Sequence, residues 1–501
     1  MKAVTRRQML KAVAAVGAGT IGGGVLGACG ATPTPQVIEK QVTVIVAGTP
    51  QVQVVKETVQ VEKTVVVQAS PQVVEKVVTA APGERPTLEF WWGWGGMTGL
   101  EALKGVCDNF NMKNPNVFVH GLNVNMGEKL LTSVSAGTPP DVAVGNIMFS
   151  EYCAREVFTA LDDFFAASKV VTKGDKDIIA SLWKDATWQG KIYGLAGCEV
   201  GPRMGMAFNN DLVTKAGLDI SKPPLTWDEA YEWHKTMTTF DNTGNLVILG
   251  FDVLDAMGGR QPTSDSSFFW ADSFGFEWWN QEKMTFDLNN DKFIASLATI
   301  KKFYDVAGAE KINGYRTSYG TWTQSPTASF PAGVQGMILN GYWTPGELVH
   351  SAPDRKFTFT WAPNSSDRRG KKFQNEGGHP VVIPKGVKNP QLSFSFLEYL
   401  TTPEAADIIL NTTGWWSPRI SWLAKIDVSK FPGADFFKNS LSEADELKPC
   451  PLCPIETFVG QQLRVTWDAV NYGDKTPEVA AKELQDNLTS ELRKQFPNLA
   501  G

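Results

Sequence analysis

The chain has 501 residues, of which 43% are hydrophobic, and its 28 phenylalanines can fill sizeable cores, so two or more globular domains are expected. The formal net charge is −6, and no basic cluster interleaves with aromatic residues, which excludes nucleic acid as the expected partner. Seventeen tryptophans is a high count. Most are expected in the core, and a minority exposed in a cleft would suit the C–H faces of sugar rings.

Residues 1–29 have the features of an export signal. A pair of arginines precedes an apolar, charge-free run over residues 12–28, which is short for a membrane span, and the arginine pair indicates the twin-arginine route. Residues 26–29 resemble a bacterial lipobox, which implies that Cys29 is diacylated and anchors the mature chain to a membrane. The alternative is a true transmembrane anchor with an unmodified cysteine. Either interpretation places the remainder outside the cytoplasm.

Residues 30–84 contain no aromatic residue and repeat Val, Gln, Lys, Glu and Thr. Parts alternate as strands do, but Pro50 and Pro71 interrupt them, and nothing aromatic is present to form a core. We therefore predict a flexible tether, which would span on the order of 40 Å as a coil and hold a lipid-anchored domain away from the bilayer. The alternative is a small β-rich stalk, or pairing between molecules.

The globular body is predicted to begin near Arg85. Residues 87–92 are expected to form a short strand that ends in a turn rich in glycine and tryptophan, and helical spacing follows over residues 98–111. Ligand groups lie beyond the carboxyl ends of strands in a parallel α/β sheet, which makes Trp92 and Trp94 candidate binding residues. The glycines of this turn lack the G-x-G-x-x-G spacing of a dinucleotide site.

The stretch from Gly190 to Glu229 predicts a series of short elements. A tight turn leads into a short apolar strand, and a small helix follows that is stopped by Gly217. A second helix is opened by Thr226, whose hydroxyl can cap it, with Glu229 three residues later completing a capping box.

This order of elements resembles the crossing between lobes in the extracellular solute-binding proteins of ABC importers, the maltose-binding-like family. The family pattern is a G-K-x-Y-G-x-P turn, an x-Y-N-K-D-L strand, an A-G-L helix end and a T-W-D-E helix start. The corresponding residues are 190–196, 206–212, 216–218 and 226–229. The chain departs from the pattern with Ala196 at the usual proline and Phe208 at the tyrosine.

Further motifs of the same family resemble parts of the chain in the same order. Residues 137–142 resemble its x-x-G-x-x-P-D-V loop and strand, after which Asn146 matches a residue that lines the cleft. Residues 152–164 resemble a helix and its L-x-x-L-D-D-Y ending. Residues 268–279 resemble the second-lobe helix that carries aromatic ligand contacts. Trp270 and Trp278 are thus each either such a contact or core, with core the first expectation.

The match over residues 328–343 gives the main site prediction. The family has A-F-x-x-G-x-x-A-M-x-x-x-G-x-W here, and Trp343 occupies the position of its sugar-stacking tryptophan. The alternative is that Trp343 packs between helices. Residues 376–390 resemble the returning strand, and residues 413–419 match a G-x-x-P-x-R loop only loosely. That loop adds cleft candidates, which are Trp415, Trp416 and Arg419.

The resemblance covers roughly residues 87–492 and implies an α/β fold of two lobes, each a mainly parallel sheet flanked by helices. The implied parts are a signal at 1–29, a tether at 30–84, a first lobe from 85–200 and 363–405, and a second lobe from 201–362 and 406–501, with crossings near 198–206, 360–366 and 400–412. Ligand would bind in the crevice and close it by hinge motion. The closed receptor would dock on an ABC permease. Tryptophan content favours a sugar or oligosaccharide as ligand, although the wider family also takes polyols and glycerol phosphates.

Apart from Cys29, five cysteines remain, an odd number for an oxidising location. Cys450 and Cys453 form a lone C-x-x-C without the context of a zinc or thioredoxin-like site, so a local disulfide is predicted. Cys107 with Cys153 is a candidate second bridge. No metal or cofactor is expected.

An enzyme is not expected, because the four histidines do not form H-E-x-x-H and no G-x-S-x-G is present. Two other classes stay open. A secreted carbohydrate-active hydrolase needs only two carboxylates, which any chain supplies. A cell-surface carbohydrate adhesin is favoured by the long tether but not by the lobe motifs.

Overall fold

The computed structural model describes residues 37–46, 49–58, 85–93, 96–145, 147–259, 269–448 and 451–497. These residues belong to two compact units, 1–78 and 79–501. The export signal and the lipobox cysteine Cys29 lie outside the described residues, so their roles stay predictions.

In the first unit, β1 (Val37–Val46) pairs antiparallel with β2 (Thr49–Thr58). Over these residues the structure has the β-rich alternative and not the flexible coil that we predicted. Pro50 lies within β2, opposite Ile45, and does not interrupt it. Both strands of a two-stranded ribbon are edge strands, where a proline removes no essential ladder bond.

The second unit contains two large sheets, and the first of them has the order β17-β16-β5-β3-β4, with β8 also paired to β16. Its strands are β3 (Thr87–Trp92), β4 (Phe118–Asn123), β5 (Val142–Val144), β8 (Gly194–Pro202), β16 (Phe373–Val382) and β17 (Glu446–Lys448). The pairs of β3 with β4 and β5 are parallel, whereas β16 runs antiparallel to β5 and β8. The helices α2 (Met97–Lys113), α13 (Pro390–Leu400) and α14 (Pro403–Thr413) pack with this sheet, which forms the first lobe.

The two faces of the first sheet contact separate apolar clusters. Trp92 lies in the cluster that contains Cys107, whereas its neighbour Trp91 lies in the cluster that contains Cys153. This follows from the alternation of side chains along a strand. Both cysteines are free and buried. The bridge considered between Cys107 and Cys153 is therefore not formed, because the sheet separates the two side chains.

The second sheet has the order β10-β11-β14-β9-β15. Its strands are β9 (Gly205–Asn209), β10 (Thr239–Phe240), β11 (Leu246–Phe251), β14 (Gln335–Asn340) and β15 (Phe357–Thr360). Only β11 and β14 pair in parallel, since β9 runs antiparallel to both β14 and β15 and β10 antiparallel to β11. The expectation of a mainly parallel sheet is therefore wrong for the second lobe. The physical reason is that β9 enters directly from the other lobe, without a crossover helix to reverse its direction.

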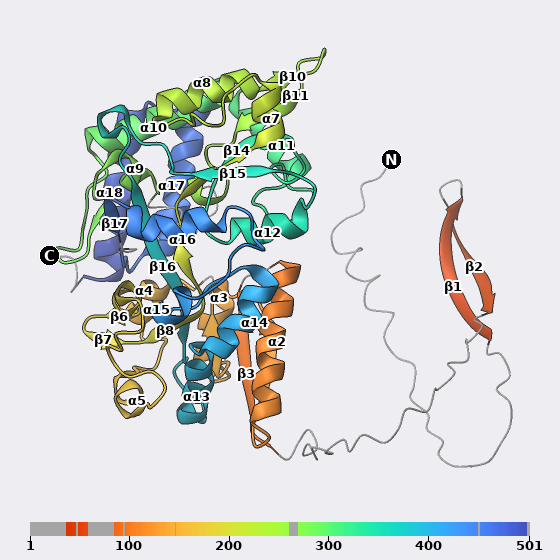
Figure 1. The fold of residues 1–501 in the computed structure, drawn as a ribbon, viewed down its shortest axis with the longest axis vertical. Helices are drawn as coiled ribbons and strands as arrows, with labels where there is room; N and C mark the ends of the chain where they lie inside the picture. The colour runs from red at the N-terminus through yellow and green to blue at the C-terminus, as the bar shows by residue number, and fades with distance from the viewer. Residues whose placement is uncertain are drawn as a thin grey trace, which may run out of the picture. The chain divides into compact units, whose positions relative to one another are not determined.

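Helices surround the second sheet and complete the second lobe (Figure 1). They are α7 (Asn210–Lys215), α8 (Trp227–Met237), α9 (Phe269–Phe274), α10 (Asp291–Tyr304), α11 (Ala309–Tyr319), α12 (Thr344–Ser351), α17 (Glu456–Asn471) and α18 (Pro477–Gln495). The short turn η1 (Ala256–Gly258) contacts β14 and α9. Along the part of the chain that the structure describes, no helix has the length and apolar character needed to cross a membrane.

The remaining elements are short. They are α3 (Gly127–Ser135), α4 (Phe149–Ala154), α5 (Asp162–Ala167), α6 (Ala180–Asp185), β6 (Thr187–Trp188), β7 (Lys191–Ile192), β12 (Trp279–Asn280), β13 (Thr285–Phe286), η2 (Ser366–Arg368), α15 (Ile420–Leu423) and α16 (Ala434–Glu443).

Local signals predicted the start of α8 and the end of α7. Thr226 Oγ1 accepts the N–H of Glu229, and the Glu229 carboxylate accepts the N–H of Thr226, which confirms the capping box. Gly217 has φ +71° just after α7, the left-handed conformation that ends many helices. Both features depend on residues close in sequence.

The helix predicted over residues 152–161 is wrong, because α4 ends at Ala154. Glu156 adopts φ +56°, Val157 N–H donates to Tyr152 O, and Glu156 N–H donates to Cys153 O. This is the double hydrogen-bond pattern of a Schellman ending. A glutamate occupies the position where glycine is usual, so no residue type signals the end of this helix.

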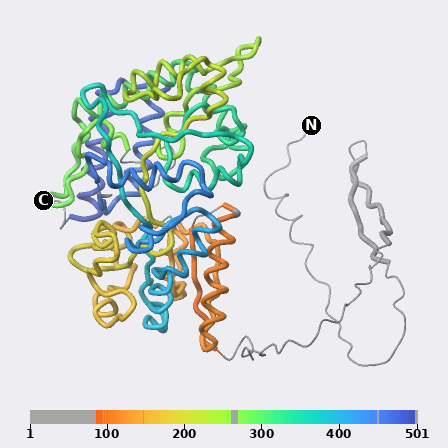
Figure 2. Tube along the Cα trace, in the orientation of Figure 1, coloured from red at the N-terminus to blue at the C-terminus, as the bar shows by residue number. Residues whose placement is uncertain are grey.

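The chain crosses between the lobes where β8 of the first sheet leads to β9 of the second, over residues 203–204, and returns along β16. Residues 365–369 still contact α8 and α9 of the second lobe, so this return lies beyond the stretch 360–366 where we expected it. Figure 2 shows the segments of β8 and β16, which pair with each other, close together in the middle of the body. The residue bounds of the lobes stay predictions, but α14 packs against α2 and so stays with the first lobe beyond the boundary expected at residue 405.

Candidate functional site

The two crossings meet around Glu199, which is the buried centre of the lobe junction. Arg203 Nη2 donates to Glu199 Oε2 over 3.1 Å, and His379 Nδ1, on the returning strand β16, lies 2.5 Å from the same oxygen. The hydroxyl of Tyr342, which follows β14 of the second lobe, donates to Glu199 Oε1 over 2.7 Å. One carboxylate thus joins the segment that leaves the first lobe, the returning strand β16 and the segment after β14 of the second lobe.

The charge of Glu199 is stabilised in this setting. Burial alone would raise the pKa of Glu199, but the charge of Arg203 and the charge and hydrogen bond of His379 lower that pKa to about 2. Burial beside this carboxylate raises the pKa of the Tyr342 hydroxyl well above its ordinary value, so the hydroxyl stays a donor. The junction therefore holds a permanent anion that its neighbours neutralise.

Tyr342 can lie this close to the crossing because the residue beneath it is glycine. A Cβ at Gly201 would lie 2.5 Å from the Tyr342 ring, closer than side-chain atoms approach. The Tyr342 N–H also donates to Pro202 O over 3.0 Å. The end of β14 is thus bound by backbone and side chain to the strand that leaves the first lobe.

Trp343 lies next to this cluster at the start of α12. Its ring centroid is 5.8 Å from the Arg203 guanidinium and 6.3 Å from the Trp322 ring, and the ring is 7% exposed. A Cβ at Gly341 would lie 2.3 Å from this ring, so glycine is needed at that turn. The structure places Trp343 at the lobe junction, among aromatic and cationic neighbours, and its ligand-stacking role stays a prediction.

The lobes contact each other beside this tryptophan. A Cβ at Gly346 of α12 would lie 1.9 Å from Thr413 O, at the end of α14. Figure 1 shows α12 and α14 facing each other across the junction. The second lobe therefore meets the first through main-chain atoms at this point.

Two of the predicted tryptophans come to the junction from the loop after α14. Trp416 lies 5.0 Å from the Tyr342 ring and forms a bridge with Val200 of β8, and its indole N–H has no partner among the described residues. Trp415 packs on the first turn of α2, where its ring lies 2.9 Å from a Cβ placed at Gly99. Trp416 and Trp343 thus both pack against Tyr342, whereas Trp415 contacts the first lobe.

The candidates at the ends of β3 and β5 are only partly described. Trp92 is buried against Gly121 of β4 and Cys107 of α2, and no described residue accepts its indole N–H. Trp94 and Asn146 lie outside the described residues, so both stay predictions.

Arg419 connects three segments of the first lobe through its guanidinium. Its guanidinium donates to Thr401 O over 2.7 Å and to Val170 O over 2.8 Å, and it pairs with Asp177 at 3.3 Å. These partners occupy the donors that a ligand would need, so the structure gives this arginine a structural role. Its assignment as a binding residue stays a prediction without support from these contacts.

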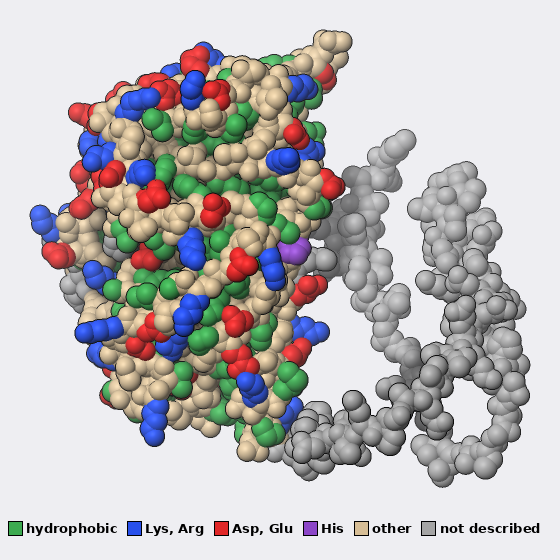
Figure 3. Space-filling model, viewed as in Figure 1, with side chains coloured by type: hydrophobic (Ala, Val, Ile, Leu, Met, Phe, Trp, Pro, Cys, Tyr) green, Lys and Arg blue, Asp and Glu red, His purple; other side chains and the backbone are tan. Residues whose placement is uncertain are grey.

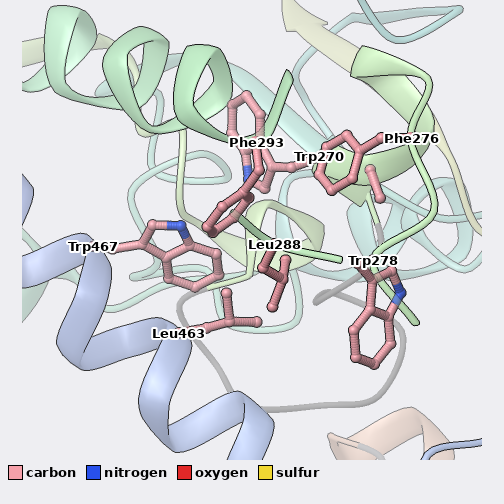
Figure 4. Close-up of a pocket in the computed structure, with 8 residues that line it drawn as sticks. Trp270, Phe276, Trp278, Leu288, Phe293, Leu463 and Trp467 are labelled. Carbon is pink, nitrogen blue, oxygen red and sulfur yellow. The ribbon is translucent and has the colours of Figure 1, made fainter. Parts of the chain in front are cut away.

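Trp270 lies in the core of the second lobe, where its indole donates to Gly258 O over 2.9 Å and its ring is 4.8 Å from Trp227. Figure 4 shows a small apolar pocket beside it, between α9, α10 and α17. The residues that line the pocket are Trp270, Ala271, Phe276, Trp278, Leu288, Phe293, Leu463 and Trp467. No charged or amide side chain lines this pocket to orient a sugar, and it is not at the lobe junction. It is best understood as a gap in core packing.

Cys453 is free and buried, and burial raises the pKa of its thiol well above the ordinary value. Cys450 lies outside the described residues. The predicted local disulfide is therefore not favoured by the placement of Cys453 and stays untested at its other end. Within the described ranges, no group of three or more His, Cys, Asp or Glu side chains is arranged to hold a metal ion.

Sequence reasoning missed Glu199, Arg203, Tyr342 and His379. Glu199 and Arg203 lie within the predicted crossing at residues 198–206, and a charged pair at a crossing is the one signal that was available. Basic and acidic side chains are interspersed over the face drawn in Figure 3, without a large patch of one sign.

Two α/β lobes, joined by crossing strands and lined with aromatic residues where they meet, define a two-lobe solute receptor. The profile of the family described as bacterial extracellular solute-binding protein matches residues 94–407, and the chain belongs to that family.

Solved structures share this fold. CpMnBP1 with mannotriose bound has a TM-score of 0.72 and 22% identity, covering 81% of this chain and 100% of that one. An ABC transporter solute-binding protein from Thermotoga lettingae, bound with α-D-tagatose, has a TM-score of 0.67 and 19% identity, with 81% and 100% covered. The maltose/maltodextrin-binding domain MalE from Bdellovibrio bacteriovorus, bound to maltotriose, has a TM-score of 0.65 and 17% identity, with the same coverage.

Proposed function

We propose that this protein captures a carbohydrate between its two lobes and delivers it to the permease of an ABC transporter. The observation that carries the proposal is the position of Trp343, which lies at the lobe junction with Arg203 and Trp322 around it. Aromatic faces at such a junction suit the C–H faces of sugars. The similar structures named above hold mannotriose, tagatose and maltotriose, which supports the same ligand class here.

Binding would use the junction as a hinge. The segment after β8 and the strand β16 link the lobes, and Glu199 joins them through Arg203 and His379. A sugar that contacts both lobes stabilises the closed arrangement by its differential affinity for that state. The permease then recognises the closed receptor.

Location and anchoring follow from the N-terminus in this proposal. The family is extracellular, and diacylation of Cys29 would hold the receptor at the outer face of the membrane. Phase partitioning in a detergent measures the lipid anchoring of the wild type and of the Cys29→Ser variant directly. We expect the variant to move to the aqueous phase with its sugar affinity unchanged. A signal-cleaved variant that stays in the detergent phase would refute the lipid anchor.

A thermal-shift panel tests the ligand class. Mannotriose, maltotriose, tagatose and a set of polyols are added to the purified protein, and we expect at least one sugar to raise the melting temperature, by RT ln(1 + [L]/Kd) in free energy. Product analysis after incubation separates binding from hydrolysis, and intact sugar is the expected result. Shorter products would favour the hydrolase, and no shift with any sugar would overturn carbohydrate as the ligand.

A further inference from the structure

A second tryptophan lies beside Trp343 on the loop between α11 and β14. The Trp322 and Trp343 ring centroids are 6.3 Å apart, with an angle of 32° between the planes. Trp322 is half-buried, whereas Trp343 is buried. Trp322 thus offers more of its ring to solvent than the residue that the sequence singled out.

The backbone of Trp322 is held in an unusual conformation. Its φ is +67°, which is rare for a bulky residue and costs free energy unless the surroundings impose it. The Trp322 N–H donates to Asp255 Oδ1 over 3.1 Å, and this buried carboxylate also accepts the Ala256 N–H. The position of the indole is therefore imposed by the fold of the second lobe.

The next residue of the loop is fixed in the same way. The hydroxyl of Thr323 donates to the buried carboxylate of Glu347 on α12 and accepts from Asn340 Nδ2 over 3.0 Å. These hydrogen bonds help to hold the strained backbone of Trp322. Backbone strain that surrounding groups impose in this way is found where a site has to be preorganised. The hydrogen bonds bind the loop to both ends of the segment that carries Trp343.

The loop also faces the other lobe. A Cβ at Gly96, just before α2, would lie 3.0 Å from Gln324 Oε1. Gly96 precedes the first helix of the first lobe, so Gln324 reaches across the junction. Trp322 is therefore on the side of the second lobe that meets the first.

The ring spacing decides how a sugar could use both tryptophans. A sugar held between two parallel rings needs two van der Waals separations, roughly 7–8 Å in total. The observed 6.3 Å and 32° lie in the range in which aromatic rings contact each other. A ligand therefore cannot insert between them and would lie along their adjoining faces.

We propose that Trp322 is a second stacking residue that lengthens the platform of Trp343, so that the site selects carbohydrates of two or more sugar units over monosaccharides. This inference rests on the proposed function. The single ring of Trp343 serves one sugar unit, and Trp322 serves the next.

Calorimetric titration of mannotriose, mannobiose and mannose tests this inference, with maltotriose, maltose and glucose as a second series. Wild-type affinity should rise by at least about tenfold from the monosaccharide to the disaccharide. Trp322→Ala should weaken trisaccharide binding by roughly fivefold to a hundredfold, the scale of one aromatic contact. Monosaccharide affinity should change by less than about twofold. Trp322→Phe should restore most of the lost affinity, because it keeps a smaller aromatic face.

Trp233→Ala is the matched control. Trp233 is also half-buried and packs 5.4 Å from Phe208, on α8 at the far edge of the second lobe (Figure 1). This variant should lose stability but keep both affinities. A Trp322→Ala protein with the same loss for mono- and trisaccharides, or with no loss, would overturn the inference.

Titration of the wild type with mono-, di- and trisaccharides also tests the inference if the Trp322→Ala protein does not fold. A receptor that binds mannose or glucose as tightly as the longer sugars refutes the role of Trp322 while the proposed function stands. A wild type that binds no sugar of either series refutes carbohydrate binding itself, and the inference fails with it.

Discussion

The Tyr342 hydroxyl donates to Glu199 Oε1 over 2.7 Å across the lobe junction. It is a neutral donor to a buried carboxylate, and hydrogen bonds to charged groups contribute more than neutral ones, about 1.5–3 kcal/mol. Tyr342→Phe should lower the free energy of unfolding by that amount in urea denaturation. Tyr315→Phe is the matched control, because the Tyr315 hydroxyl donates to a neutral acceptor, Val334 O, within one lobe, where about 1 kcal/mol is expected. Equal losses would show that the charge at Glu199 adds nothing.

Glu199 should make the protein sensitive to acid. The pKa of Glu199 falls from 4.5 to about 2 on folding, so its contribution to stability is complete above pH 4.5 and is lost as the pH falls from there towards 2. Glu199→Gln leaves Arg203 without its anion and should cost about 3–5 kcal/mol at pH 7. The difference between wild type and variant should shrink steadily in denaturant titrations from pH 5 to pH 3. A difference that is constant with pH would contradict the ion pair.

Glu347 should have the opposite pH dependence. Burial raises the pKa of Glu347 from 4.5 to about 7, so the folded protein favours the neutral acid. The stabilisation is fully present below pH 4.5 and is lost as the pH rises through 7. Glu347→Gln imitates the neutral acid and should be more stable than the wild type by about 1–3 kcal/mol at pH 8, with little difference at pH 4.5. Thermal melts at the two pH values measure this, and a variant that is less stable at pH 8 would refute it.

Alanine variants of Trp343 and Trp270 distinguish a ligand-binding residue from a core residue. Both rings are buried, so truncation to alanine should cost each about 3–5 kcal/mol of unfolding free energy without ligand. Only Trp343→Ala should weaken sugar binding, by roughly 1–3 kcal/mol, because Trp270 lies inside the second lobe. Calorimetry on the folded fraction of each variant gives the comparison. Full affinity in Trp343→Ala would make this residue core, and the main site prediction would be wrong.

The sequence predicted the parts of the fold that depend on neighbouring residues. Thr226 and Glu229 are three residues apart, and their capping box formed as expected. Ordered motifs also indicated the two lobes and the position of Trp343. The end of α4 escaped prediction because Glu156 takes a conformation that its side chain does not signal.

The centre of the junction depends on contacts between distant residues. Glu199 and Tyr342 are 143 positions apart, and neither periodicity nor spacing connects them. Trp322 lies outside every motif that we identified. Its place beside Trp343 is set by the hydrogen bond of its N–H to Asp255 and by the path of a loop. The hydrogen bonds of Arg419 to Thr401 O and Val170 O are equally invisible in a G-x-x-P-x-R pattern.

The contact of Gly346 with Thr413 leaves no space between α12 and the end of α14. Two main chains meet there, and a main chain, unlike a side chain, cannot make room by changing rotamer. Any side chain at position 346 would therefore have to push α12 away from the first lobe.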